Sequence, residues 1–313
     1  MSSTVQAGPT ATAVGPARPS REKTRGQWRK RIEIGVFAGP ALLVYVSFVF
    51  FPVVLAAYYS FFNWNGLGPL DRFIGFDNYT RALTDPVFHG AIGNNILILV
   101  LSLLIQGPLA IAIALLLNRR IRGRGVLRLM IFVPYVLSEV IVGLAWRLIL
   151  QPHGPFDTVM DSLGLGGLRQ LWLADPSFVM WTLFAVLTWK YLGLAIILFL
   201  AGLQGVPEEL SEAASIDGAS WWQREWQITI PILRRTIAMA VIISVIGSLL
   251  AFTQFYVLTK GGPGTDTTTV VQYIYNRAFV QLQLGAATAL SIVLVAVVGI
   301  VTAVQFWLLR EKD

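Results

Sequence analysis

The sequence predicts an all-α membrane protein with six transmembrane helices. Apolar residues make up 55% of the 313 residues and charged residues only 13%, whereas soluble domains carry about 25% charge. The apolar residues gather in six long stretches, and each can cross a bilayer, which takes about 20 residues of helix. Within lipid such a segment must be helical, because only a helix pairs all its backbone groups internally without a closed barrel.

The expected elements follow one another in a simple order. Residues 1–35 form a basic tail rich in Ser, Thr, Ala, Gly and Pro, which we expect to be disordered and cytoplasmic. The membrane domain covers residues 36–308, and residues 309–313 form a second cytoplasmic tail. The expected spans are Val36–Phe61, Ile92–Leu117, Val126–Leu150, Val179–Leu203, Thr236–Leu258 and Ala286–Leu308.

Lysine and arginine residues predict the orientation of these spans, because short loops rich in them stay in the cytoplasm. They concentrate in both tails and in the loops after the second and fourth spans, as Arg18, Arg21, Lys23, Arg25, Arg29, Lys30, Arg31, Arg119, Arg120, Arg122, Arg124, Arg224, Arg234, Arg235, Arg310 and Lys312. Both termini are therefore expected in the cytoplasm. The net charge of +7 then reports membrane topology and does not indicate nucleic-acid binding.

A polar loop, Gly205–Leu233, separates the fourth and fifth spans, and its local signals predict two short helices. Pro207 suits the first position of a helix, and two glutamates follow it in the first turn, where negative charge favours the helix dipole. Gly218 can take the left-handed conformation that ends a helix. Ser220 with Gln223 forms a capping-box pattern for the second helix. The alternative is an amphipathic loop that lies on the membrane surface.

This loop resembles the EAA loop of the binding-protein-dependent inner-membrane permeases of ABC importers. The family pattern, Glu-Ala-Ala-x-x-x-Gly followed by Ile-x-x-Pro, occurs here as Glu212–Gly218 and Ile228–Pro231. The resemblance implies a type I ABC importer permease fold, in which this loop is a coupling helix that docks on a separate ATPase subunit. It assigns ATPase coupling to Glu208, Glu209, Glu212, Ala213, Ala214, Asp217 and Gly218.

Three further segments resemble the carbohydrate-uptake subgroup of this family, and specifically its maltose- or glycerol-phosphate-type first permease subunit. Phe73–Tyr79 matches F-x-G-x-x-N-Y, Val133–Tyr135 is similar to L-P-Y, and Leu258–Phe279 resembles the L-T-x-G-G-P…T…Y-x-Y/F…A-F block. The resemblance runs from about residue 36 to the C-terminus.

The sequence indicates no enzyme, catalytic residue, cofactor or metal site. It contains no cysteine, and its two histidines, His89 and His153, lie far apart in loops, so Cys- or His-ligated metals are not expected. No G-x-x-x-x-G-K-[ST] pattern occurs, so the chain is not expected to bind ATP through a P-loop. ATP and Mg²⁺ are expected on the partner ATPase.

Glu139 and Lys190 lie near the middle of the third and fourth expected spans, where a charge is costly. They could form a purely structural salt bridge or line a polar cavity. Counted from the motifs, the resemblance also places residues of the fourth and fifth spans at sugar-lining positions, although Ala251 departs from the polar residue of maltose-type members. The predicted substrate pathway comprises Glu139, Trp189, Lys190, Tyr191, Leu194, Ser244, Ser248, Ala251 and Phe252. Helix packing is the alternative role for the small residues.

The expected function is therefore import of a carbohydrate, and specifically an oligosaccharide, across a bacterial inner membrane. The implied partners are a second related permease, a pair of ATPase subunits, an extracytoplasmic solute-binding protein, the sugar and membrane lipid, with no nucleic acid. A permease for glycerol phosphate or another solute is the nearest alternative. A secondary transporter that couples uptake to protons through Glu139 is a second alternative, and a membrane-embedded enzyme would lack any catalytic constellation.

Overall fold

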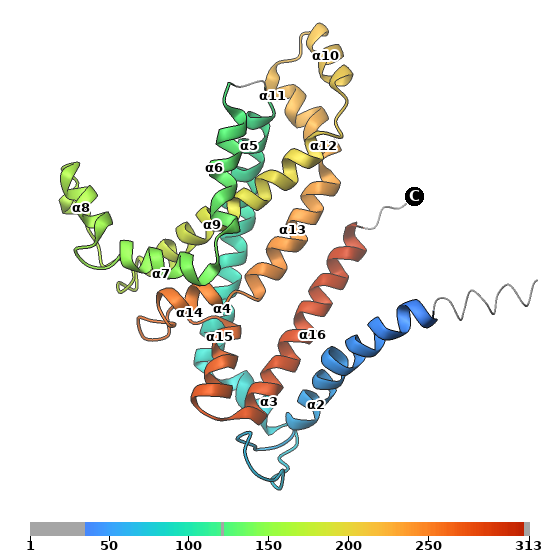
Figure 1. Cartoon of the computed structure of the whole chain (residues 1–313), viewed down its shortest axis with the longest axis vertical. Helices are drawn as coiled ribbons and strands as arrows, with labels where there is room; N and C mark the ends of the chain where they lie inside the picture. The colour runs from blue at the N-terminus through green and yellow to red at the C-terminus, as the bar shows by residue number, and fades with distance from the viewer. Residues whose placement is uncertain (1–34, 120–121, 310–313) are drawn as a thin grey trace, which may run out of the picture. The chain divides into compact units, whose positions relative to one another are not determined.

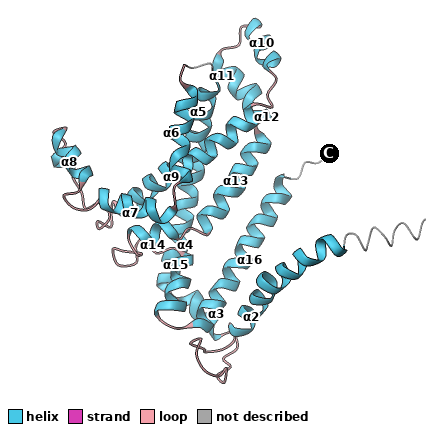
Figure 2. Ribbon diagram, in the orientation of Figure 1, coloured by secondary structure: helices cyan, strands magenta, loops and turns pink. Residues whose placement is uncertain are grey.

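The structure is a computed structural model that describes residues 35–119 and 122–309 (Figure 1). The described residues form helices joined by loops and contain no strand (Figure 2). An isolated antiparallel bridge joins Phe62 to Phe73. The all-α class is confirmed. The expected basic tail before Gly35, Arg120 and the residues after Leu309 lie outside the described part.

Among the described residues, four helices are long and apolar enough to cross a membrane. The first of them is Gly35–Tyr59, which includes η1 (Val46–Phe50) and α2 (Phe51–Tyr59). The second is Pro86–Asn118, which comprises α4 (Pro86–Leu101), η2 (Ser102–Gln106) and α5 (Gly107–Asn118). The other two are α9 (Val179–Leu203) and Leu284–Leu308 of α16 (Leu284–Leu309). These helices correspond to the first, second, fourth and sixth expected spans. The chain divides into two units, one that ends at Val54 and one that begins at Leu55.

The third expected span is broken, so the prediction of one helix over Val126–Leu150 was wrong. α6 (Arg124–Val136) and α7 (Glu139–Ile149) meet at an angle of 98°. Leu137 and Ser138 between them are extended, with ψ of 147° and 138°. Pro134 lacks an N–H donor and weakens the end of α6. Glu139 is consequently the first residue of α7 and does not lie in the middle of a continuous helix.

The fifth expected span, Thr236–Leu258, also ends differently from the prediction. α13 (Arg234–Leu249) stops at Leu249, and a separate short helix, α14 (Thr253–Leu258), follows. The side chain of Asn95 on α4 donates hydrogen bonds to the last carbonyls of α13, at 2.6 Å to Ser248 and 3.2 Å to Leu249. These bonds pair carbonyls that a helix end leaves without partners. Ala251 and Phe252 therefore lie in the break after α13.

The remaining elements of this unit are short. They are α3 (Asp77–Thr84), α8 (Pro155–Ser162), η3 (Gly166–Leu168), α10 (Glu208–Ile216), α11 (Trp221–Arg224), η4 (Glu225–Thr229), α12 (Ile230–Ile232), α15 (Val270–Tyr275) and η5 (Asn276–Val280). The segment Trp221–Ile232 meets α13 at an angle of 69°. α10 and α11 lie at one end of the unit, and α3 and α15 lie towards the other (Figure 1).

Small buried residues hold the centre of this unit together. Ala110 and Ala114 of α5 are fully buried against Ile196 and Phe199 of α9, and Leu233 completes this cluster. Small side chains allow two helix backbones to approach closely, which favours helix association in lipid. α9 is thereby packed between α5 and α6, and its position determines where its polar residues lie.

Candidate functional site

The EAA-like loop forms the two short helices that the sequence predicts. α10 begins at Glu208, one residue later than predicted, because Pro207 has an extended ψ of 127° and is the N-cap. Gly218 has a φ of +83°, the left-handed conformation expected after a helix end. None of the residues of α10 is buried, and the apolar side chain of Ile216 is 87% exposed. α10 is therefore a solvent-facing helix with an exposed apolar side chain at its C-terminal end.

The predicted coupling residues gather on α10 and the turn after it. Glu208, Glu209, Glu212, Ala213, Asp217 and Gly218 are exposed, and Ala214 is half-buried. The structure thus places these residues together on one projecting segment, while their coupling role remains a prediction.

The second helix of the loop ties it to the body of the protein. Ser220 and Gln223 form the predicted capping box, with Ser220 N–H donating to Gln223 Oε1 at 2.7 Å. The guanidinium of Arg119, at the end of α5, lies 4.4 Å from the ring centroid of Trp221. A cation over an indole face is attracted by the ring quadrupole. This contact links the loop to the end of α5, and the chain itself links the loop to α13.

Lys190 lies at the break between α6 and α7. Its side chain is only 2% exposed, and Nζ donates to the backbone carbonyls of Pro134 and Tyr135, each at 3.0 Å, and to that of Leu137. An ammonium group has three donors. The predicted contact of Lys190 with a substrate would need one of these donors, and in this conformation all three are used.

Glu139 stands on the other side of the same break. Its carboxylate accepts a hydrogen bond from the Tyr191 hydroxyl at 2.6 Å, and its backbone carbonyl accepts one from Gln254 Nε2 at 3.0 Å. No ion pair joins Glu139 to Lys190 within the described residues, so the salt bridge that one interpretation predicted is not formed. The two neighbouring residues Lys190 and Tyr191 instead hold opposite sides of the break.

The other predicted pathway residues do not form one cluster. Trp189 packs edge-on against Trp146, with ring centroids 5.4 Å apart, and Phe252 contacts Tyr256 and Tyr275. Ala251 packs against a buried cluster that contains α7 and α9 residues. Ser248 is buried, and Leu194 and Ser244 are half-buried. In the part of the chain that the structure describes, no hydrogen bond or ring contact joins these α13 residues to the α9 residues.

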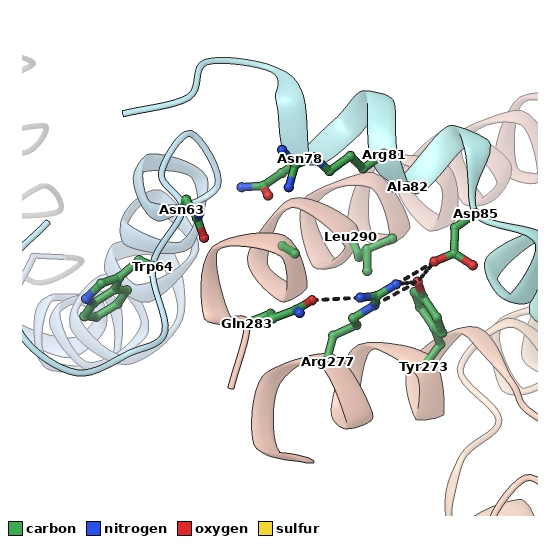
Figure 3. A pocket seen from close by; sticks show the side chains of 11 residues that line it. Asn63, Trp64, Asn78, Arg81, Ala82, Asp85, Tyr273, Arg277, Gln283 and Leu290 are labelled. Atoms are coloured by element: carbon green, nitrogen blue, oxygen red, sulfur yellow. Dashed lines mark hydrogen bonds and ion pairs between the residues drawn. The ribbon is translucent and has the colours of Figure 1, made fainter. Parts of the chain in front are cut away.

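A cavity of about 300 Å³ opens among α3, α15, η5 and α16, at the end of the unit opposite α10. Figure 3 shows the guanidinium of Arg277 between Gln283 on one side and Asp85 and Tyr273 on the other. Arg277 donates to Gln283 Oε1 at 2.7 Å and to Asp85 Oδ2 at 2.5 Å, and Tyr273 also donates to Asp85. Asp85 is in addition the N-cap of α4, where it accepts from the N–H groups of Val87 and Phe88.

This network shifts the protonation equilibria of its members. Burial opposes ionisation of Asp85, but the hydrogen bonds from Tyr273, Val87, Phe88 and Arg277 outweigh it and lower the pKa of that carboxyl. Burial and the hydrogen bond to Asp85 raise the pKa of Tyr273 to about 12. Arg277 therefore faces a persistent carboxylate, and the network joins the start of α4 to α15 and η5.

Sequence reasoning did not predict how the breaks and this network are stabilised. Asn95, Gln254, Asp85 and Arg277 each act on residues that are far away in the sequence. One local signal was present, because Asp85 followed by Pro86 is a common start of a helix. Within the described residues, no group of His, Asp and Glu could hold a metal ion.

Among the described residues, four helices are long and apolar enough to cross a membrane, or six if each bent pair counts as one span, and a polar helix projects from one end. The chain belongs to the family described as binding-protein-dependent transport system inner membrane component, which it matches over residues 106–311. Members of this family are the permease components of ABC importers. The chain is therefore a transport subunit and not an enzyme, and the ATPase is a separate subunit.

Similar proteins cover nearly the same length. The chain is 37% identical over 273 residues to the multiple sugar-binding transport system permease protein MsmF of Streptococcus mutans, with 87% of this chain and 93% of MsmF covered. It is 34% identical over 282 residues to the diacetylchitobiose uptake system permease protein NgcF of Streptomyces coelicolor, with 86% and 80% covered.

A solved structure shares the fold. A chain of a bacterial ABC transporter involved in the import of the acidic polysaccharide alginate superposes with a TM-score of 0.80 at 24% identity, and 92% of this chain and 99% of that chain are covered.

Proposed function

We propose that this chain is a permease subunit that imports a carbohydrate, and specifically an oligosaccharide, into a bacterial cell through the inner membrane. Each bent pair then counts as one span, which gives six spans, with both termini in the cytoplasm. The observation that carries the proposal is α10, an uncovered helix that bears the Glu212–Gly218 pattern and projects from one end of the protein. A helix of this kind requires a partner, and the partner is the dimer of ATPase subunits.

The names of the relatives support a carbohydrate substrate. The relative from Streptococcus mutans is named for multiple sugars and the one from Streptomyces coelicolor for diacetylchitobiose. A second candidate substrate is glycerol 3-phosphate, because the chain is 30% identical over 278 residues to a glycerol-3-phosphate permease of Agrobacterium fabrum. Membership of a binding-protein-dependent family argues against a proton-coupled mechanism through Glu139.

The proposed machine contains a second related permease and an extracytoplasmic solute-binding protein. ATP-driven closure of the ATPases moves α10, and the contact between Arg119 and Trp221 passes this movement to α5. The two permeases then alternate between inward-open and outward-open pathways. Each step needs a state that binds its partner or substrate more tightly than the alternative state does. The solute-binding protein delivers the sugar to the outward-open state.

The substrate pathway lies between the α6–α7 break, α9 and the end of α13. We assign its lining to Glu139, Trp189, Tyr191, Leu194, Ser244, Ser248, Ala251 and Phe252. Sugar sites combine aromatic faces with hydrogen-bonding groups, and polar groups left unpaired on binding cost affinity. Trp189, Tyr191 and Phe252 supply the aromatic faces, and Glu139 and the serines supply the polar groups.

The Glu212→Ala variant tests the proposal. The assembled complex is placed in liposomes, and uptake of a sugar retained by its solute-binding protein is measured together with ATP hydrolysis. Glu212→Ala should abolish uptake per ATP hydrolysed while the chain stays in the membrane. Asp71→Ala, which removes an exposed acid outside the polar loop, is the matched control and should transport normally. Normal uptake in Glu212→Ala would refute the coupling role of α10.

A further inference from the structure

The backbone carbonyls at the C-terminal end of α6 need hydrogen-bond donors, although the side chains of Val136 and Leu137 are exposed and only Pro134 is buried. The last carbonyls of any helix lack partners within the helix. α6 ends at Val136, and its bend of 98° towards α7 directs these carbonyls away from a continuing helix. In the hydrocarbon region no water satisfies such groups. A broken span is therefore stable there only if another part of the protein supplies the donors.

Lys190 supplies them from the facing helix. Its Nζ lies 3.0 Å from the carbonyl oxygens of Pro134 and of Tyr135, and it also donates to the carbonyl of Leu137. These residues span the last turn of α6 and the first residue of the break. The positive charge is also favourable at the negative end of the α6 dipole.

Gly193 brings α6 close enough for this contact. It lies three residues after Lys190 on α9 and is buried. A Cβ atom at this position would lie 3.1 Å from Phe132 Cα and from the carbonyl carbon of Ile131. The close approach of the two backbones and the lysine contact thus lie on the same face of α9, and together they determine the position of α6.

We propose that Lys190 is a positioning residue for transport: it clamps the C-terminal end of α6 and so maintains the bend that presents Glu139 and Tyr191 to the substrate pathway. The inference rests on the proposed function for the pathway, but the clamp itself is a property of the resting protein. Lys190 acts through α6 and does not touch the substrate.

Distances between spin labels on α6 and α7 test the clamp directly. The chain contains no cysteine, so Met130→Cys and Leu148→Cys, both at exposed positions, introduce one label on each helix. Electron paramagnetic resonance then measures the distance between them in the assembled, nucleotide-free complex. Lys190→Met keeps the length of the side chain and removes its donors, whereas Lys190→Arg keeps a charged donor. Lys260→Met, at an exposed lysine, is the matched control.

If Lys190 clamps α6, the parent and Lys260→Met should show a narrow distance distribution. Lys190→Met should show a shifted or broadened distribution. Lys190→Arg should return partly to the narrow one. Basal hydrolysis of Mg·ATP by the same complexes should persist in Lys190→Met, whereas sugar uptake is lost. An unchanged distribution with normal uptake in Lys190→Met would overturn the clamp. Failure of the parent complex to transport with ATP would instead overturn the proposed function.

A second measurement needs no substitution and covers the case in which Lys190→Met does not fold. A membrane-permeant N-hydroxysuccinimide ester acylates free lysine amines. In the intact complex Lys260 should react while Lys190 remains unmodified, because its three donors are engaged and its side chain is 2% exposed. Equal labelling of both lysines by mass spectrometry would contradict the clamp.

Discussion

Replacing Gly193 with alanine should separate α6 from α9. The added Cβ would lie 3.1 Å from Phe132 Cα and from the Ile131 carbonyl carbon, and closer still to the Ile131 carbonyl oxygen. Because these atoms belong to the backbone, no side chain can rotate away, and α6 must move by several tenths of an ångström. Overpacking of this kind typically costs about 1–3 kcal/mol.

The same movement lengthens the hydrogen bonds from Lys190 to the end of α6. Two of them are now 3.0 Å long, and such bonds weaken beyond about 3.2 Å. A hydrogen bond to a charged group contributes about 1.5–3 kcal/mol, so the loss for Gly193→Ala should fall near the upper end of the overpacking range.

Unfolding in sodium dodecyl sulfate, followed by far-ultraviolet circular dichroism, measures this loss. Gly247→Ala is the matched control, because a Cβ on Gly247 of α13 meets no atom within 4 Å. The control should be neutral or should gain up to about 1 kcal/mol from the better helix propensity of alanine. Equal stabilities for the two variants would refute the close packing of α6 on α9.

Three further predictions concern the network at Asp85 and the polar loop. Because the pKa of Asp85 is lowered from 3.8, its carboxylate stabilises the fold above that pH, and this contribution is lost as the pH falls below it. The free energy of unfolding of the parent should therefore exceed that of Asp85→Asn by about 1.5–3 kcal/mol at neutral pH. A difference that persists in strong acid would contradict the network. Because the pKa of Tyr273 is raised from 10.0 to about 12, its neutral hydroxyl stabilises the fold fully below pH 10, and this stabilisation is lost as the pH rises through about 12. The difference between the ultraviolet titrations of the parent and of Tyr273→Phe should show one late-ionising tyrosine. Ionisation of this tyrosine near pH 10 would argue against its hydrogen bond to Asp85. Ser220→Ala should lower the stability of the fold by about 1 kcal/mol and accelerate amide exchange in α11, because it removes the capping box. The control Ser215→Ala should change neither. Equal exchange rates in the two variants would exclude the capping box as a source of stability.

The features that were predictable from the sequence are those with a local signal. α9 was predicted with its observed bounds, because Val179–Leu203 is a continuous apolar stretch of sufficient length. The turn at Gly218 and the capping box at Ser220 were predicted from residues that lie within a few positions of each other.

The breaks in the third and fifth spans were not predictable in this way. Each helix end is satisfied by a side chain from a different span, Lys190 for α6 and Asn95 for α13. The apolar composition of Val126–Leu150 does not distinguish a bent pair from a straight helix, and Pro134 is a local signal that weakens α6 without determining the bend. Lys190 itself was identified as unusual, but its role depends on which atoms of α6 lie opposite, and only the packing reveals that.

Purification of the tagged chain from its native membrane, with mass spectrometry of the proteins that remain bound, tests the central claim most directly. A second permease of the same family and an ATPase with a P-loop should be recovered with the chain. A chain that purifies alone and still transports would contradict the account.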